Sequence, residues 1–310
     1  MITKKPKFPS YYSPPDMTSE LATRIVGGHV MSVAIIGLCF NIFLFFHFMS
    51  FKEKLSFYIL CTSKTISNSM SLLVYLCYIG PVNLFFTDIG STFLNTRIQQ
   101  IFGFGLFMQG PMTQMIITVN RFLVIMFSPT TVPKYNIHIT VATLSLVWLA
   151  GIWWSTLPGF KEECFAPFVF PHVGFFLTEC NQKIVVWVAC IIVSLAVFNN
   201  SMNIVLAIKL AISVRKMRGF SSEVARIRRR QTTRFFIQSC IQDWFTALVC
   251  ATNIISVDHI CPTNACSILT TFAVDSMNYT GDGFVMFVFN FKRRANKTSG
   301  TIVVSSVVNN

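Results

Sequence analysis

Charged residues are scarce in this chain of 310 residues. Only 12% of the residues are Asp, Glu, Lys or Arg, whereas 53% are apolar, including 32 Phe. Globular proteins carry about 25% charged residues, because their surfaces must interact with water. The mean hydropathy of +0.59 therefore indicates that lipid surrounds much of the chain. This composition excludes an ordinary soluble enzyme.

Motifs that carry enzyme or metal chemistry are also missing. The sequence has no CxxC pair, no HExxH, no Gly-rich phosphate loop and no convincing nucleophile–base set, and common catalytic and metal sites depend on such patterns. We therefore expect no catalytic residues, no metal and no cofactor. An internal repeat, which marks many transporters, is not evident either.

Long apolar runs, by contrast, are abundant. A helix needs about 20 apolar residues to cross the hydrocarbon core of a bilayer. Seven segments meet that length and predict an all-α membrane protein with a seven-helix bundle: 26–49, 57–79, 98–127, 139–157, 184–211, 235–256 and 265–289. Residues 1–25 are expected to precede the bundle on one side of the membrane, and residues 291–310 to form a short basic tail on the other.

Basic residues in the connecting segments predict the orientation, because short loops rich in Lys and Arg stay in the cytoplasm. The segments 50–56, 121–138, 209–234 and 290–310 together hold 17 basic residues and two acids. The other face holds seven of each. We expect an extracellular N-terminus and a cytoplasmic C-terminus. The net charge of +13 is then a topology signal and does not indicate nucleic-acid binding.

A few polar residues interrupt the expected spans. Asn41, Lys64, Asp243 and Asp282 all lie roughly 10–12 Å from the cytoplasmic edge, at about 1.5 Å per helical residue. Charged groups are costly in hydrocarbon and usually face partners inside a bundle. We predict an intramembrane polar network of these four residues. The alternative is that some of them face a neighbouring protein or reach the membrane surface.

Three further polar side chains are candidates for a ligand pocket: Gln109 and Gln114 in the third span and Asp275 in the seventh. Hydrogen bonding between helices is an equally good explanation for them. Gly110 and Pro111 lie between the two glutamines and should loosen or kink the third helix, since Pro removes a backbone hydrogen bond.

Several short motifs follow one another in a characteristic order. They are Ser63-Lys64-Thr65-Ile66-Ser67-Asn68, Gly80-Pro81, Asn120-Arg121-Phe122, Ser128-Pro129, Tyr135, Gln238-Ser239-Cys240-Ile241-Gln242-Asp243, Asp282-Gly283-Phe284 and Phe289-Asn290. From about residue 27 to residue 292, the chain resembles nematode serpentine receptor class X, a family of chemoreceptor-like proteins in the rhodopsin-type superfamily. In that fold the second and seventh helices adjoin, which implies a Lys64–Asp282 pair.

The resemblance also implies coupling to a heterotrimeric G protein at the inner end of the third helix. Arg121 would be the switch residue; the alternative is an arginine that only anchors the helix at the membrane surface. Asn120 stands where an acid is usual and cannot form an ion pair with Arg121. We therefore expect the contact that holds the receptor in its inactive state to be weaker or to lie elsewhere. Four basic residues before the sixth helix either dock the G protein or bind anionic lipid: Arg226, Arg228, Arg229 and Arg230.

The rhodopsin-type disulfide cannot form, because no Cys occurs between Cys77 and Cys164. We expect a Cys164–Cys180 bridge in the loop after the fourth helix, with Cys77 as a competitor for either residue. A Cys261–Cys266 bridge is a further candidate in the last outer loop.

With this resemblance, the sequence predicts a G-protein-coupled chemosensory receptor of the plasma membrane. The resemblance implies a location in the cilia of chemosensory neurons. A small-molecule ligand would bind in the outer half of the bundle. A multi-pass transporter or channel that uses the intramembrane charges is the alternative, and a membrane enzyme is a third, weaker one.

Overall fold

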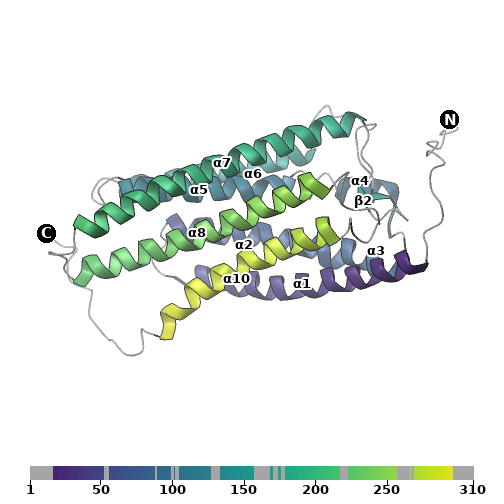
Figure 1. Cartoon of the computed structure of the whole chain (residues 1–310), viewed down its shortest axis with the longest axis horizontal. Helices are drawn as coiled ribbons and strands as arrows, with labels where there is room; N and C mark the ends of the chain where they lie inside the picture. The colour runs from purple at the N-terminus through teal and green to yellow at the C-terminus, as the bar shows by residue number, and fades with distance from the viewer. Residues whose placement is uncertain are drawn as a thin grey trace.

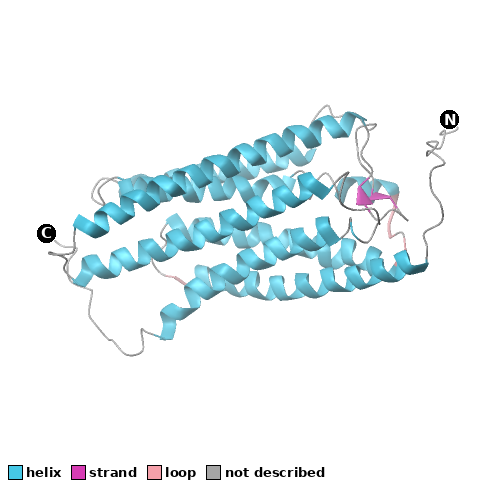
Figure 2. Cartoon of the chain, viewed as in Figure 1, coloured by secondary structure: helices cyan, strands magenta, loops and turns pink. Residues whose placement is uncertain are grey.

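The computed structural model describes residues 17–51, 56–87, 89–98, 101, 105–126, 133–156, 168–169, 174–175, 179–216, 223–256, 266 and 269–295. Nearly all of these residues are helical, and the helices run lengthwise through the molecule (Figure 2). Seven long helical segments alternate in direction (Figure 1). We call the end of the bundle where the first helix begins the N-terminal end, and the opposite end the C-terminal end.

The first two segments pack closely against each other. Helix α1 spans Met17–Met49, and the second segment continues from α2 (Ser56–Val74) through the π-helical turn η1 (Tyr75–Ile79) into α3 (Gly80–Phe85). Pro81 explains the wide turn, because Pro has no N–H and its ring crowds the carbonyl one turn earlier. Gly80 accordingly donates its N–H to the oxygen of Tyr75, five residues back.

The other segments are α5 (Phe107–Met126), α6 (Pro133–Thr156), α7 (Glu179–Lys216), α8 (Glu223–Ser256) and α10 (Val274–Ala295), the last preceded by the π-helical turn η4 (Leu269–Ala273). At the C-terminal end, α7 and α8 extend beyond the predicted spans 184–211 and 235–256. Apolar runs mark only the part of a helix that fits in lipid, and the basic residues beyond them are good helix formers.

Small elements close the N-terminal end. Helix α4 (Thr92–Ile98) lies there beside the strands β1 (Phe168–Val169) and β2 (Gly174–Phe175), which pair antiparallel (Figure 1). Within the described ranges this hairpin is the one departure from the all-helical prediction. Two residues per strand do not change the fold class.

The bundle is apolar outside and polar inside. Phe46, Leu146, Trp187, Ile204 and Trp244 are each more than 60% exposed, whereas many amides, hydroxyls and charges are buried. This arrangement reverses that of a water-soluble protein and fits a lipid surrounding, in which polar side chains hold helices together.

Four of the described helical stretches are long and apolar enough to cross a membrane: Glu20–Met49, Ser56–Phe85, Ile137–Ser155 and Val186–Ile212. Helices α5, α8 and α10 are not among these four, and each of them carries buried polar residues, as α2 also does.

Two adjacent glycines in α1 have different surroundings. A Cβ on Gly27 would lie 2.5 Å from the backbone nitrogen of Leu84 and 2.8 Å from the backbone carbon of Asn83, both in α3. A Cβ on Gly28 would meet only the Leu84 Cδ1 atom, at 3.7 Å. Of these two glycines, only Gly27 is required by the close approach of α1 and α3.

Replacing Gly27 by Ala should lower the stability of the protein by about 1–3 kcal/mol, because the backbone of α3 would have to move. Gly28→Ala is the matched control and should be neutral or slightly stabilising, since Ala favours a helix over Gly by about 1 kcal/mol. Thermal unfolding of the purified protein in lipid measures both effects. Equal unfolding temperatures for the two variants would contradict the close approach.

Candidate functional site

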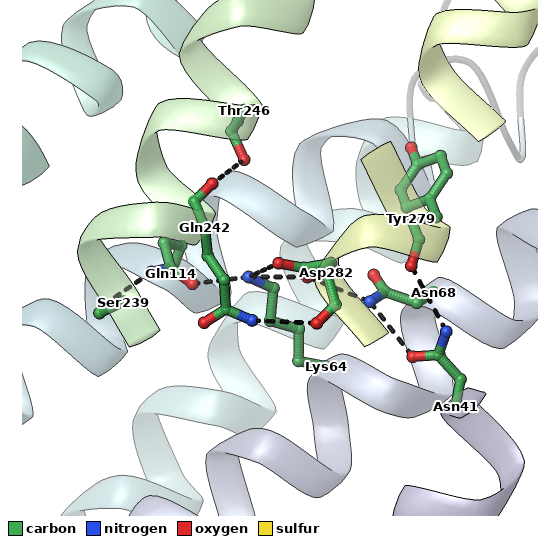
Figure 3. Close-up of polar contacts among 9 residues, drawn as sticks. All are labelled: Asn41, Lys64, Asn68, Gln114, Ser239, Gln242, Thr246, Tyr279 and Asp282. Carbon is green, nitrogen blue, oxygen red and sulfur yellow. Dashed lines mark hydrogen bonds and ion pairs between the residues drawn. The ribbon is translucent and has the colours of Figure 1, made fainter. Parts of the chain in front are cut away.

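A buried ion pair lies at the centre of the bundle. Lys64 of α2 places its Nζ atom 2.8 Å from Oδ2 of Asp282 in α10 and donates a hydrogen bond of 3.0 Å to Oδ1 (Figure 3). The two residues are only 3% and 5% exposed. Both charges lose their hydration at this depth, so the pair is stable only if other groups satisfy the remaining protons and lone pairs.

Two amides supply these additional hydrogen bonds. The Oε1 atom of Gln114 in α5 accepts from Lys64 Nζ at 2.7 Å. Asn68 donates from Nδ2 to Asp282 Oδ2 at 3.1 Å. Asn68 follows Lys64 by four residues and therefore lies on the same face of α2. The cation and the carboxylate each have an amide partner besides each other.

Asn41 brings α1 into the same network. Its Oδ1 atom accepts from Asn68 at 3.4 Å, and its Nδ2 atom donates to the backbone oxygen of Tyr279 at 3.4 Å (Figure 3). The Nδ2 atom also donates to the backbone oxygen of Gly37, at 2.8 Å. Gly283 allows this approach, because a Cβ there would lie 2.6 Å from Asn41 Nδ2.

Helix α8 joins through two more side chains. Gln114 donates from Nε2 to the hydroxyl of Ser239 at 2.8 Å, and Gln242 donates to the backbone oxygen of Asp282 at 3.5 Å. Residues from α1, α2, α5, α8 and α10 therefore meet in one hydrogen-bonded network (Figure 3). We call it the central network.

A small cavity adjoins the ion pair on the side of the N-terminal end. Its volume is about 20 Å³, which is room for about one water molecule. Its lining combines the ion pair with residues of α2, α5, α8 and α10: Lys64, Asn68, Phe107, Gly110, Pro111, Thr246, Val249, Asn278, Tyr279 and Asp282. A polar group that enters this cavity would meet both charges.

Three of the four residues expected in the network meet in the structure, namely Asn41, Lys64 and Asp282. Asp243 of α8 lies at its edge, where it accepts a hydrogen bond of 2.5 Å from Asn203 of α7. Depth along a helix is visible in the sequence, whereas the direction of a side chain around the helix axis is not.

The three pocket candidates do not lie together. Gln114 belongs to the central network, Gln109 lies beside the indole of Trp148 in α6, and Asp275 accepts a hydrogen bond of 3.4 Å from the hydroxyl of Tyr75. None of the three lines the cavity beside the ion pair. Gln114 and Asp275 both contact the second helical segment, at different levels, and Gln109 contacts α6.

Arg121 of α5 is buried near the C-terminal end, with 7% of its surface exposed. The guanidinium carbon lies 5.0 Å from the ring centre of Phe57, which is itself 4.3 Å from the ring centre of Phe235 in α8. Within the described part of the chain, none of the three guanidinium nitrogens has a hydrogen-bond partner. Asn120 donates instead to the hydroxyl of Thr140 in α6, at 3.5 Å. Among the described residues, Arg121 is therefore a buried cation without an acceptor.

Several expected features fall partly outside the described residues. The first turns of α8 contain Arg226, Arg228, Arg229 and Arg230, but their side chains are not described. Cys164, Cys261 and the side chain of Cys180 also lie outside the described part of the chain. Cys266 is disulfide-bonded. Cys77 is free, so it does not compete for Cys164 or Cys180 as considered above.

Sequence reasoning missed four residues of these polar sites: Asn68, Ser239, Gln242 and Asn203. The spacing of four residues between Lys64 and Asn68 was a usable signal, because it places both on one helix face. Asn203 gave no comparable signal, since its partner Asp243 lies on another helix.

The family follows from a comparison with known protein families. A profile described as serpentine type 7TM GPCR chemoreceptor Srx matches residues 31–290. The chain belongs to the Srx family. The crystal structure of squid rhodopsin is similar to it, with a TM-score of 0.71 and 14% identity over 94% of the Srx chain and 90% of the rhodopsin chain. At this identity the likeness concerns the fold alone. No curated protein matches the chain.

These findings confirm the expected family and the seven-helix fold. The Srx chain is a multi-pass membrane protein of a family of serpentine chemoreceptors.

Replacing Asp282 by Asn should leave the ammonium of Lys64 buried without its counter-charge, which costs about 3–5 kcal/mol. The exposed Arg24–Glu20 pair at 2.7 Å provides the control, because Glu20→Gln should cost less than about 1 kcal/mol. Thermal unfolding in lipid compares the two variants. An Asp282→Asn protein as stable as the Glu20→Gln protein would show that the buried pair does not form.

Proposed function

We propose that this Srx chain is a chemosensory receptor of the plasma membrane, in the cilia of sensory neurons, that activates a heterotrimeric G protein. The ligand is a small molecule that binds in the half of the bundle toward the N-terminal end. That end faces outward and the C-terminal end faces the cytoplasm. The excess of basic residues in the segments at the C-terminal end supports this orientation.

The observation that carries the proposal is the unsatisfied guanidinium of Arg121. A buried donor without an acceptor is costly, and here three nitrogens are left without one among the described residues. A partner that brings backbone carbonyl oxygens to this end of the bundle would supply the acceptors that the described residues do not. A G protein inserting a segment at the cytoplasmic face is such a partner.

The aromatic contact beside Arg121 suggests how access is controlled. Phe57 of α2 packs on the guanidinium and also contacts Phe235 of α8. An outward movement of α8 at this end would separate the two rings and open the space around Arg121. Movements of packed helices between two arrangements are a common form of molecular switch.

The central network offers a route from ligand to α8. The cavity beside Lys64 and Asp282 lies toward the N-terminal end, and α8 is tied to the same network through Ser239 and Gln242. A ligand with a polar group in an enlarged cavity would compete for these bonds. It would thereby favour the arrangement in which α8 is free to move, as a shift between two existing states.

Ligand-dependent exchange of guanine nucleotide on a G protein reconstituted with the receptor tests the proposal. A panel of volatile and water-soluble small molecules is screened, and Arg121→Gln serves as the uncoupled control. We expect exchange that depends on a ligand and is lost in Arg121→Gln. Ligand-dependent ion or solute flux without nucleotide exchange would indicate a channel or transporter instead.

Asn120→Asp should lower signalling in the absence of ligand, because a carboxylate next to Arg121 could form the ion pair that Asn cannot. Asn120→Ala is the matched control: it removes the amide without adding a charge and should not lower this basal activity. Basal nucleotide exchange is measured at equal surface expression. An unchanged basal activity in Asn120→Asp would refute the idea that Asn120 weakens the inactive state.

Replacing Arg226, Arg228, Arg229 and Arg230 by Gln should abolish coupling, because these residues lie on the part of α8 that would move with it. The orientation should survive, since 13 of the 17 basic residues on this face remain. The control replaces the four basic residues of the tail region, Lys292, Arg293, Arg294 and Lys297, and should keep coupling. Normal nucleotide exchange in the first variant would mean that these arginines only hold the segment at the lipid surface.

A further inference from the structure

The cavity beside the central ion pair admits only a very small group. Its volume of about 20 Å³ holds about one polar heavy atom. The space continues to Gly110 of α5, where an added Cβ atom would meet no heavy atom within 4 Å outside the backbone of its own helix. A hydroxyl oxygen or an ammonium nitrogen fits this volume. A carboxylate or phosphate group, with three or more polar and central atoms, does not.

The ion pair offers this cavity a hydrogen-bond acceptor and no donor. Lys64 Nζ has three oxygens within 3.0 Å, one for each of its N–H groups: Gln114 Oε1 and both carboxylate oxygens of Asp282. A carboxylate can accept about four hydrogen bonds, and the contacts from Lys64 and Asn68 use three. The Asp282 side chain also keeps 7% of its surface exposed. A group that enters the cavity must therefore be a donor.

Asn278 provides a second polar contact in the same cavity. It precedes Asp282 by four residues, so both lie on one face of α10, and both line the cavity. Asn278 is only partly buried, and among the described residues nothing hydrogen-bonds to its amide. An amide can donate as well as accept. A group that donates to Asp282 can thus also accept from Asn278, and a hydroxyl group does both.

The charges in the wall favour a neutral group. The lining residues carry one cation and one carboxylate, Lys64 and Asp282, and these contact each other at 2.8 Å. An ammonium group bound to Asp282 would place a second cation beside Lys64 with a single carboxylate to balance both. An uncompensated buried charge is costly. A hydroxyl group adds no charge and leaves the pair intact.

We propose that the ligand of this receptor is a neutral alcohol whose hydroxyl group occupies the cavity between α2, α5, α8 and α10. The hydroxyl donates a hydrogen bond to the carboxylate of Asp282 and accepts one from the amide of Asn278. The inference rests on the chemosensory function proposed above, because it names the chemical class of the ligand.

Thermal stabilisation of the purified full-length protein in phosphatidylcholine nanodiscs tests the ligand class without a G protein. The probes are linear, branched and cyclic alcohols, each compared with the methyl ether, the ammonium compound and the carboxylate of the same carbon skeleton. We expect at least one alcohol to raise the unfolding temperature. Its methyl ether, which accepts hydrogen bonds but donates none, should bind about tenfold more weakly.

Gly110→Ala places a methyl group in the cavity and should weaken binding of this alcohol about tenfold or more. Gly281→Ala is the matched control, because its Cβ would meet only ring atoms of Phe245, at 3.9 Å, and Gly281 does not line the cavity. Without ligand the two variants should unfold at similar temperatures. The proposal is overturned if no alcohol stabilises the protein, if stabilisation is equal in both variants, or if an ammonium compound or carboxylate binds more tightly than its alcohol.

Nucleotide exchange on the reconstituted G protein separates this inference from the proposed function. An alcohol whose binding depends on Gly110 but that triggers no exchange would contradict the proposed function and retain the site. Exchange triggered by a ligand that acts equally on Gly110→Ala and Gly281→Ala would retain the receptor function and overturn the proposed ligand class.

Discussion

The contact between the ammonium of Lys64 and the carboxylate of Asp282 is the interaction on which the bundle depends. At this depth neither charge has water, so the pair is stable only with further hydrogen bonds. Gln114 and Asn68 provide them, and these amides in turn need partners, which come from α8 through Ser239 and from α1 through Asn41. One ion pair between α2 and α10 thereby determines how five helices meet.

The lipid surroundings also explain why the centre of the bundle and its C-terminal end differ. Because lipid favours an apolar exterior, polar side chains collect inside, and each of them must find a partner there. The central network achieves this in the middle of the bundle. Arg121 is different, since it is buried on Phe57 and none of its nitrogens has an acceptor among the described residues. The hydrogen bonds of the central network are thus satisfied, whereas several other buried polar groups, Arg121 among them, have no partner among the described residues. The position of Arg121 suits a receptor whose partner binds near the C-terminal end.

Much of the fold could be predicted, because bilayer thickness and helix rise link apolar length to a membrane span. The ends of α7 and α8 could not, since helices continue past the lipid on basic residues such as Arg215. The depth of Lys64 and Asp282 was also readable, and the family fold made them neighbours. The direction of a side chain around its helix was not readable. For that reason Asp243 was expected in the network but is bonded to Asn203, and for Gln109, which faces α6, a ligand pocket and a contact between helices could not be told apart from the sequence.

Exchanging the charges of Lys64 and Asp282 tests whether the bundle depends on this ion pair. Thermal unfolding and ligand-dependent nucleotide exchange are measured for Lys64→Asp, Asp282→Lys and the double variant. Each single variant buries two like charges and should be strongly destabilised. The double variant should recover part of the stability and signalling, because the amide of Gln114 can turn over and the hydroxyl of Ser239 can then donate to it. Recovery should not be complete, because turning over the Asn68 amide breaks its bond to Asn41. A double variant that unfolds at as low a temperature as the worse single variant would contradict the account.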